Sequence, residues 1–207
     1  MSPEADAPAD PAGAAPDRRA APPPRDELER VRARDPEALG RFFERYFDLV
    51  YGVALRLLGM REAAEDLTQE VFFKVQRAAD QIDPSRDPAP WLTTIVYNAA
   101  RDVWRSRTHQ LARRSASLDA DEPAVPELES RAPGPERAYA LKERERLVQE
   151  ALDRLPEPLR AAIVLHDYQG LGHDEIATLT GIGHAAARTR YSRAHAALAA
   201  ALDGRIE

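Results

Sequence analysis

Residues 91–107 combine side chains that can stack on bases, hydrogen-bond base edges and hold phosphate. Most of these side chains are spaced three or four residues apart. They are one hydroxyl, one aromatic ring, one amide and two guanidinium groups: Thr94, Tyr97, Asn98, Arg101 and Arg105. Positions three or four residues apart share one face of an α-helix, and proteins use these groups on bases and on the phosphate backbone. Apolar residues mark another face: Leu92, Ile95, Val96, Ala99 and Val103. The stretch predicts a helix with one face in a core and another on nucleic acid.

A second candidate nucleic-acid surface lies in a predicted helix over residues 184–202. A short predicted helix at 173–180 precedes it, and Gly181 and Ile182 supply the turn, which is the layout of a helix-turn-helix. The packing stripe of the later helix is Ala187, Tyr191, Ala194, Leu198 and Leu202. The residues facing away from that stripe are Ala185, Arg188, Thr189, Ser192 and Arg193. Such a face can be merely solvated, but the short preceding helix and the turn favour DNA binding.

The predicted helix over residues 62–79 carries a different kind of surface. Leu67, Val71 and Val75 form its core stripe. Four polar side chains, three of them acidic, and one phenylalanine lie off that stripe: Glu65, Asp66, Gln69, Glu70 and Phe73. An exposed phenylalanine beside acids suits a protein interface. On periodicity alone, Phe73 packing beneath a neighbouring loop is an equal alternative.

The residues that mark helix ends predict that these surfaces belong to an all-α protein. Asp35-Pro36 reads as an N-cap followed by proline at the first helical position, and Gly59 ends the apolar stripe that follows. Residues 82–90 contain three prolines, so they predict a loop that leads into the 91–107 helix. Trp91 and Trp104 are predicted to be core or rim residues.

The pattern divides into two small helical domains. Residues 1–25 predict a disordered Ala/Pro-rich tail, and residues 26–107 predict the first domain. Residues 108–135 lose all periodicity and gain Pro, Ser and acids, which is typical of a flexible linker. Residues 136–207 predict the second domain, with its last helices at 156–168, 173–180 and 184–202.

The charge balance argues against a strong free DNA binder. The chain of 207 residues has a formal net charge of −6, so long-range attraction to DNA is lacking. The charge is uneven: residues 101–114 hold five Arg and one Asp, whereas residues 117–136 hold six acids and one Arg. Local basic patches can hold DNA, but we expect the isolated chain to bind it poorly.

Several classes of protein are disfavoured. The chain has no cysteine, which rules out disulfides and thiolate zinc sites. Its five histidines show no ligand-like pairing, so no metal site is expected, and His166 reads as a core residue. We find no phosphate-binding Gly-rich loop or nucleophile motif, and we expect neither enzyme activity nor a cofactor. No apolar run is long enough for a bilayer, and residues 1–25 contain no hydrophobic signal-peptide core, so a cytoplasmic location is expected.

Two sets of motifs carry a family resemblance. The C-terminal set is Leu155-Pro156, Gly170-Leu171, Asp174-Glu175-Ile176-Ala177, Gly181-Ile182 and Arg188-Thr189-Arg190. It resembles the fourth domain of bacterial sigma factors of the extracytoplasmic-function (ECF) group. The N-terminal set is Ala64-Glu65-Asp66-Leu67-Thr68-Gln69-Glu70-Val71-Phe72 together with Pro90-Trp91-Leu92, Ile95, Asn98 and Asp102. It resembles the polymerase-binding and promoter-melting helices of that group's second domain.

The resemblance implies a role for each surface. On the clamp helices of the polymerase β′ subunit, the docking residues would be Glu65, Asp66, Gln69, Glu70 and Phe73. The C-terminal domain would meet the β flap. The 91–107 helix would read and open the minus-10 promoter element, with Ile82 and Asn98 holding a flipped base. The C-terminal helix-turn-helix would recognise the minus-35 element. The resemblance also implies an anti-sigma partner.

Two other classes of function stay open on the sequence. The first is a helix-turn-helix regulator whose N-terminal domain senses a ligand or dimerises. The acidic net charge and the polar, aromatic 91–107 helix favour the sigma-factor interpretation over it. The second is an adaptor without a DNA role, which leaves both arginine clusters unexplained.

Overall fold

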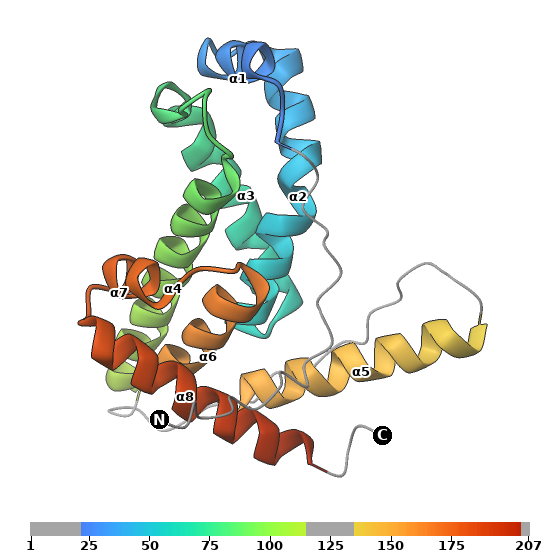
Figure 1. The fold of residues 1–207 in the computed structure, drawn as a ribbon, viewed down its shortest axis with the longest axis vertical. Helices are drawn as coiled ribbons and strands as arrows, with labels where there is room; N and C mark the ends of the chain where they lie inside the picture. The colour runs from blue at the N-terminus through green and yellow to red at the C-terminus, as the bar shows by residue number, and fades with distance from the viewer. Residues whose placement is uncertain (1–21, 115–134, 204–207) are drawn as a thin grey trace, which may run out of the picture.

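The part of the chain that the structure describes folds into helices (Figure 1). The structure is a computed structural model, and it describes residues 22–114 and 135–203. Within these two ranges it contains no strand, which confirms the predicted all-α class. The elements are α1 (Arg25–Arg32), α2 (Pro36–Leu58), α3 (Arg61–Arg77), the 3₁₀ turn η1 (Ala79–Gln81), α4 (Ala89–Arg114), α5 (Pro135–Asp153), α6 (Glu157–Ile163), the π-helical turn η2 (Val164–Tyr168), α7 (His173–Thr180) and α8 (His184–Leu202).

The boundaries of α2 follow from its terminal residues. The Asp35 carboxylate accepts a hydrogen bond of 2.9 Å from the backbone N–H of Ala38, which satisfies one of the free donors of the first turn. Pro36 occupies the first helical position, where its missing N–H costs nothing. At the other end Gly59 has φ 72°, a left-handed conformation that glycine adopts without strain. The predicted start and stop of this helix are confirmed.

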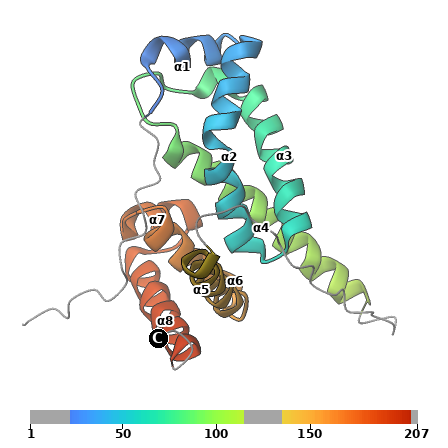
Figure 2. The ribbon, with the colours of Figure 1, turned by 90° about the vertical axis from the view of Figure 1, so that its right-hand side faces the viewer.

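In the N-terminal half, α2, α3 and α4 pack side by side, and α1 lies across one end of α2 (Figure 2). Apolar stripes from all three long helices meet in the core. The fully buried side chains include Phe42, Val50, Val53, Leu57, Leu67, Val71, Val75, Leu92 and Val96. This packing fixes which faces of α3 and α4 remain available to other molecules.

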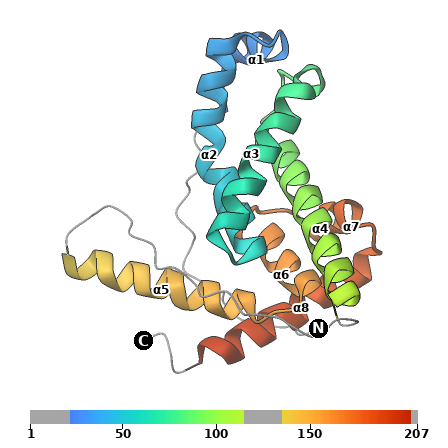
Figure 3. The ribbon, with the colours of Figure 1, turned by 180° about the vertical axis from the view of Figure 1, so that it is seen from behind.

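In the C-terminal half, α6 packs on α8, and α7 contacts the start of α8 (Figure 3). The helices predicted at 173–180 and 184–202 have those bounds in the structure. A small core of Leu152, Leu155, Ile163 and Ala194 lies between α5, α6 and α8. The short helix α7, the turn at Gly181 and the long helix α8 form the predicted helix-turn-helix.

The two halves share one hydrophobic core, which the sequence did not predict. Apolar residues of α6, η2, α7 and α8 belong to the same buried cluster as those of α2, α3 and α4. Polar contacts cross the same boundary: Arg160 donates to the Leu57 carbonyl at 2.9 Å, and the Arg56 guanidinium lies 4.3 Å from the centre of the Tyr168 ring. The predicted linker, residues 108–135, begins and ends in helix, because α4 reaches Arg114 and α5 starts at Pro135. Its central part and most of the predicted N-terminal tail lie outside the described residues.

Candidate nucleic-acid and polymerase interfaces

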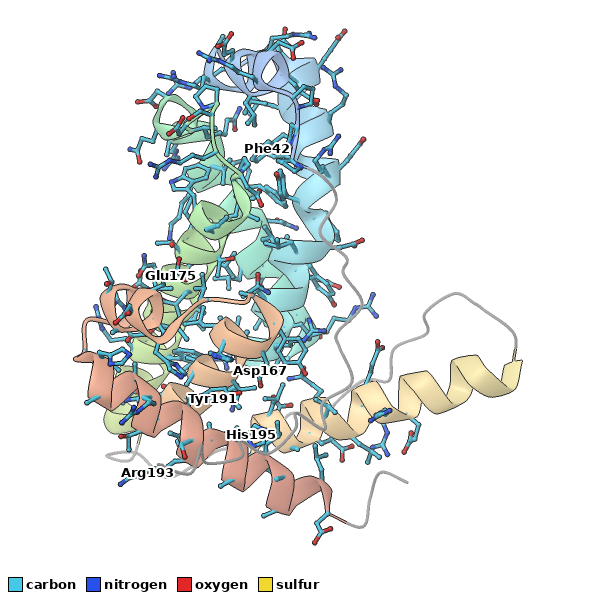
Figure 4. All side chains as sticks on the ribbon, in the orientation of Figure 1. Phe42, Asp167, Glu175, Tyr191, Arg193 and His195 are labelled. Carbon is cyan, nitrogen blue, oxygen red and sulfur yellow. The ribbon has the colours of Figure 1, made fainter. Side chains whose placement is uncertain are left out.

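The polar face of α4 borders an open cleft. Thr94 and Asn98 line one wall of this cleft, and the other wall is made by α7 through Asp174, Glu175, Thr178 and Leu179. The cleft has a volume of about 590 Å³, and Figure 4 shows Glu175 on the part of α7 that lies beside α4. Among the described residues the Asn98 side-chain amide has no hydrogen-bond partner. Its donor and acceptor are therefore open to a base edge.

Two predicted minus-10 residues are buried, although the sequence placed them at a DNA-facing surface. Tyr97 is 6% exposed and Ile82 is 3% exposed. The Tyr97 ring meets the Trp104 ring edge-on, with centroids 6.4 Å apart, and burial raises the pKa of its hydroxyl. The positive charges of Arg101 and of Arg190 on α8 oppose this rise in pKa. Neither side chain can contact DNA in this arrangement.

The two predicted arginines of α4 differ in environment. Arg105 is exposed and lies 3.9 Å from the Asp102 carboxylate, so it is available to phosphate. Arg101 is partly buried, and within the described ranges its Nε has no hydrogen-bond partner. A buried donor without a partner is costly. Contact with a phosphate oxygen would satisfy it.

The predicted recognition face of α8 is exposed along its length. Its members are Ala185, Arg188, Thr189, Ser192 and Arg193. The opposite side is anchored by Ala187 and Ala194, which are 1% and 0% exposed. At the start of α7, the Glu175 carboxylate accepts a hydrogen bond of 2.8 Å from the Gly172 N–H. This bond caps the helix N-terminus, where glycine has no side chain to act as a cap. The geometry is that of a recognition helix held by its neighbour.

The exposed surface of α3 carries the predicted polymerase-docking residues. Glu65, Asp66, Gln69 and Glu70 are all exposed, and Phe73 is 63% exposed. The prediction that Phe73 packs beneath a loop is therefore excluded within the part of the chain that the structure describes. Glu65 pairs with Arg61 and Glu70 pairs with Lys74, but these exposed pairs hold their acids weakly.

A row of aromatic rings from α2 and α3 extends this surface, and none of these rings was among the predicted docking residues. Phe47 is 48% exposed and stacks on Phe72 of α3 with centroids 6.5 Å apart. It also stacks on Tyr51 at 5.8 Å. We call these three rings the aromatic row. The signal was present as Phe47 and Tyr51 at a four-residue step, but Phe47 was counted with the apolar core stripe of α2.

Comparisons with known proteins place both halves of the chain in one family. Residues 42–110 match the family model of sigma-70 region 2, and residues 145–198 match that of sigma-70 region 4. The first match contains α3 and most of α4, and the second contains the helix-turn-helix. The order of the two regions is that expected from the sequence motifs.

Curated relatives agree along the length of the chain. The chain is 37% identical to the ECF RNA polymerase sigma factor SigE of Mycolicibacterium smegmatis over 70% of this chain and 54% of that protein. It is 30% identical to the RNA polymerase sigma-H factor of Pseudomonas aeruginosa over 85% of this chain and 92% of that protein. With CarQ of Myxococcus xanthus the identity is 33%, over 81% of this chain and 91% of that protein. The match thus spans about half of SigE but nearly all of the other two.

Solved structures share the fold. The sigma factor RpoE of Bartonella quintana, in complex with the anti-sigma factor NepR, superimposes with a TM-score of 0.59 at 21% identity, covering 80% of this chain and 96% of that one. CnrH, in complex with the cytosolic domain of CnrY, gives a TM-score of 0.55 at 24% identity, covering 86% and 96%. The chain therefore belongs to the sigma-70 family of RNA polymerase sigma factors. Within that family it is an alternative sigma factor of the ECF group, a transcription initiation factor and not an enzyme.

Proposed function

We propose that this sigma factor uses three separate surfaces in initiation. The exposed face of α3, with the aromatic row beside it, docks on the clamp helices of polymerase β′. The polar face of α4 reads and opens the minus-10 element, and the exposed face of α8 reads the minus-35 element while its domain meets the β flap. The residues carrying these roles are Glu65, Asp66, Gln69, Glu70 and Phe73 for polymerase; Ile82, Thr94, Tyr97, Asn98, Arg101 and Arg105 for the minus-10 element; and Ala185, Arg188, Thr189, Ser192 and Arg193 for the minus-35 element.

One observation supports the proposal most directly. A single chain contains region 2 and region 4, and each region has an exposed surface whose side chains suit its proposed role. Phe73 and its acids suit a protein partner, and the arginines of α8 suit a DNA groove. A dimeric regulator would need neither a sigma region 2 nor a polymerase-docking surface.

The domain limits of 26–107 and 136–207 and a cytoplasmic location are part of the same proposal. No described helix has the length and apolar character to cross a bilayer.

Because relatives of this fold are seen with anti-sigma factors, we include an anti-sigma protein among the proposed partners. Run-off transcription tests the function directly. Purified core polymerase should initiate from a selected promoter with this chain and not without it. Absence of any promoter-dependent transcript across a genomic promoter library would reject the proposal.

We predict that the free chain binds promoter DNA negligibly at physiological salt. The net charge of −6 repels DNA, and the minus-10 face lies against the acidic first turn of α7, with Asp174 and Glu175 on the opposite wall of the cleft. Tyr97 and Ile82 are buried in the same arrangement. Docking on core polymerase must therefore separate α4 from α7 before the minus-10 element is read. Gel-shift titration of free chain and holoenzyme on the same promoter checks this. Tight, sequence-specific binding by the free chain would contradict it.

We predict that Arg188→Ala or Arg193→Ala weakens promoter complexes about ten-fold or more. Loss of a bidentate base contact costs about 1–3 kcal/mol, and both side chains are exposed on α8. Affinity for core polymerase should not change, because neither arginine belongs to the proposed polymerase-docking residues. Arg154→Ala, which removes an exposed arginine outside α8, is the matched control in filter-binding titrations of holoenzyme. Wild-type affinity in both α8 variants would show that another face of the helix meets DNA.

A further inference from the structure

Histidines scattered along the sequence meet around one tyrosine in the C-terminal half. The His166 ring lies 4.1 Å from the Tyr191 ring and 4.9 Å from the His173 ring, centre to centre. His173 in turn lies 5.3 Å from Tyr191 and 6.2 Å from His184. His195 touches the other side of Tyr191 at 6.0 Å. These ring contacts could not be predicted from the sequence, and His166, which was predicted to be a core residue, is only partly buried. We call these five residues the histidine cluster.

The cluster lies where α7, η2 and α8 pack together. Tyr191 belongs to the packing side of α8, and its hydroxyl donates to the Asp167 carboxylate of η2 at 2.9 Å. The same carboxylate oxygen lies 2.8 Å from His166 Nδ1. Figure 4 shows Asp167, Tyr191 and His195 close together at this junction. The stacked rings therefore help set how the recognition helix sits on α7.

The surroundings of His173 disfavour a positive charge. His173 and His184 are the first residues of α7 and α8, at the positive ends of the two helix dipoles. Burial lowers the pKa of His173, and the positive charges of His166, His184 and Arg188 lower it further, against the opposing charge of Asp174. Within the described ranges its Nδ1 is buried and has no hydrogen-bond partner.

The acids around the cluster offset only part of the positive charge that protonated histidines would bring. The Asp167 carboxylate on η2 is in hydrogen-bond contact with both His166 and Tyr191. On α7, Glu175 is held by the Gly172 N–H, and Asp174 lies 3.6 Å from His184 Nε2. From α8, Arg188 adds positive charge beside His173. Among the described residues no group of acids and histidines is arranged to bind a metal ion, so the ligand that the cluster can take up is the proton.

We propose that the histidine cluster is a pH-sensitive support for the recognition helix. Neutral imidazoles stack and hold α8 against α7, whereas protonation places like charges side by side at two helix N-termini and loosens the helix-turn-helix. Mild acidification then weakens minus-35 recognition while the α2–α3–α4 bundle keeps its structure. The last consequence rests on the proposed role of α8, but the loosening itself does not.

The direction of the pH effect follows from linkage. In the unfolded chain His173 takes up a proton near its ordinary pKa of about 6.5. In the folded chain that pKa is lowered, so the unfolded state binds more protons as the pH falls. The stabilisation is fully present above pH ~6.5 and is lost as the pH drops toward the folded-state pKa. Each pKa unit of difference changes the opening equilibrium about ten-fold.

Hydrogen exchange on the full-length chain tests the proposal without polymerase or DNA, so its failure is distinct from failure of the proposed function. Between pH 7.5 and about pH 5.5 we expect amide protection in α7 and α8, corrected for the intrinsic exchange rate, to fall several-fold. Protection in α2 should stay constant. His173→Gln should remove most of this pH dependence, and His109→Gln, whose side chain lies outside the described residues, should preserve it. Equal pH dependence in wild type and His173→Gln, or none in wild type, would overturn the proposal.

A second measurement does not depend on the variant folding. NMR titration of the imidazole signals of the wild-type chain should give His173 a midpoint below its ordinary value of about 6.5. The chemical shifts of Tyr191 should change over the same pH range. A midpoint at or above the ordinary value would overturn the proposal even if His173→Gln cannot be purified.

Discussion

Phe73→Ala is expected to lower the affinity for core polymerase by about 30-fold or more, while the melting temperature stays near that of wild type. A central aromatic side chain at a protein interface contributes about 2–4 kcal/mol when it is buried against a partner. In the free chain Phe73 is 63% exposed, so removing its ring leaves no cavity in the core. Binding should therefore suffer much more than folding.

The matched control is Gln76→Ala, an exposed substitution one turn further along α3 and outside the predicted docking residues. Core binding can be followed by fluorescence anisotropy of a labelled sigma factor, with thermal melts of each variant alongside. Phe47→Ala reports whether the aromatic row belongs to the same interface, because Phe47 is 48% exposed and stacks on Phe72. If Phe73→Ala binds core polymerase as tightly as Gln76→Ala does, the docking surface lies on another face.

Most of the helices and the outward faces of α3 and α8 could be predicted from the sequence. Asp35, Pro36 and Gly59 mark the ends of α2 through local backbone chemistry, which the sequence states directly. The same holds for the turn at Gly181, whose φ of 72° ends α7. Periodicity then identified Leu67, Val71 and Val75 as the core stripe of α3, and all three are buried. Each of these features depends on neighbours within a few residues.

What the sequence could not predict depends on partners far along the chain. Periodicity assigns a face to a side chain but not the element that will cover that face. Tyr97 packs edge-on against Trp104, and Thr93 lies 3.2 Å from Gln169 of the C-terminal half. The histidine cluster likewise unites residues from η2, α7 and α8. The closed packing of the two halves is therefore a tertiary property, and it decides how accessible the predicted minus-10 residues are.

Promoter opening is expected to fall sharply in Asn98→Ala, with folding and core binding close to normal. Holding a base out of the stack costs a few kcal/mol, and an amide that offers both a donor and an acceptor can offset part of that cost. Asn98 is partly exposed and lines the cleft beside α7, and its side-chain amide makes no hydrogen bond to another described residue. A purely structural role for its amide therefore has no support among its described neighbours.

If promoter opening falls in Asn98→Ala, the cause is either a lost base contact or a general disturbance of the cleft. Thr178→Ala distinguishes these two causes, because Thr178 lines the same cleft from α7 and is not a predicted base contact. Permanganate reactivity of unpaired thymines in holoenzyme–promoter complexes measures the opening. We expect it to drop at least ten-fold in Asn98→Ala, the equivalent of about 1.4 kcal/mol, and to stay at the wild-type level in Thr178→Ala. Pro84 and Pro88 in the loop before α4 leave little backbone freedom to lose when the loop closes on a base, so this difference should persist at low temperature. Normal opening by Asn98→Ala at unchanged thermal stability would remove Asn98 from the melting step and leave base capture to other residues of α4.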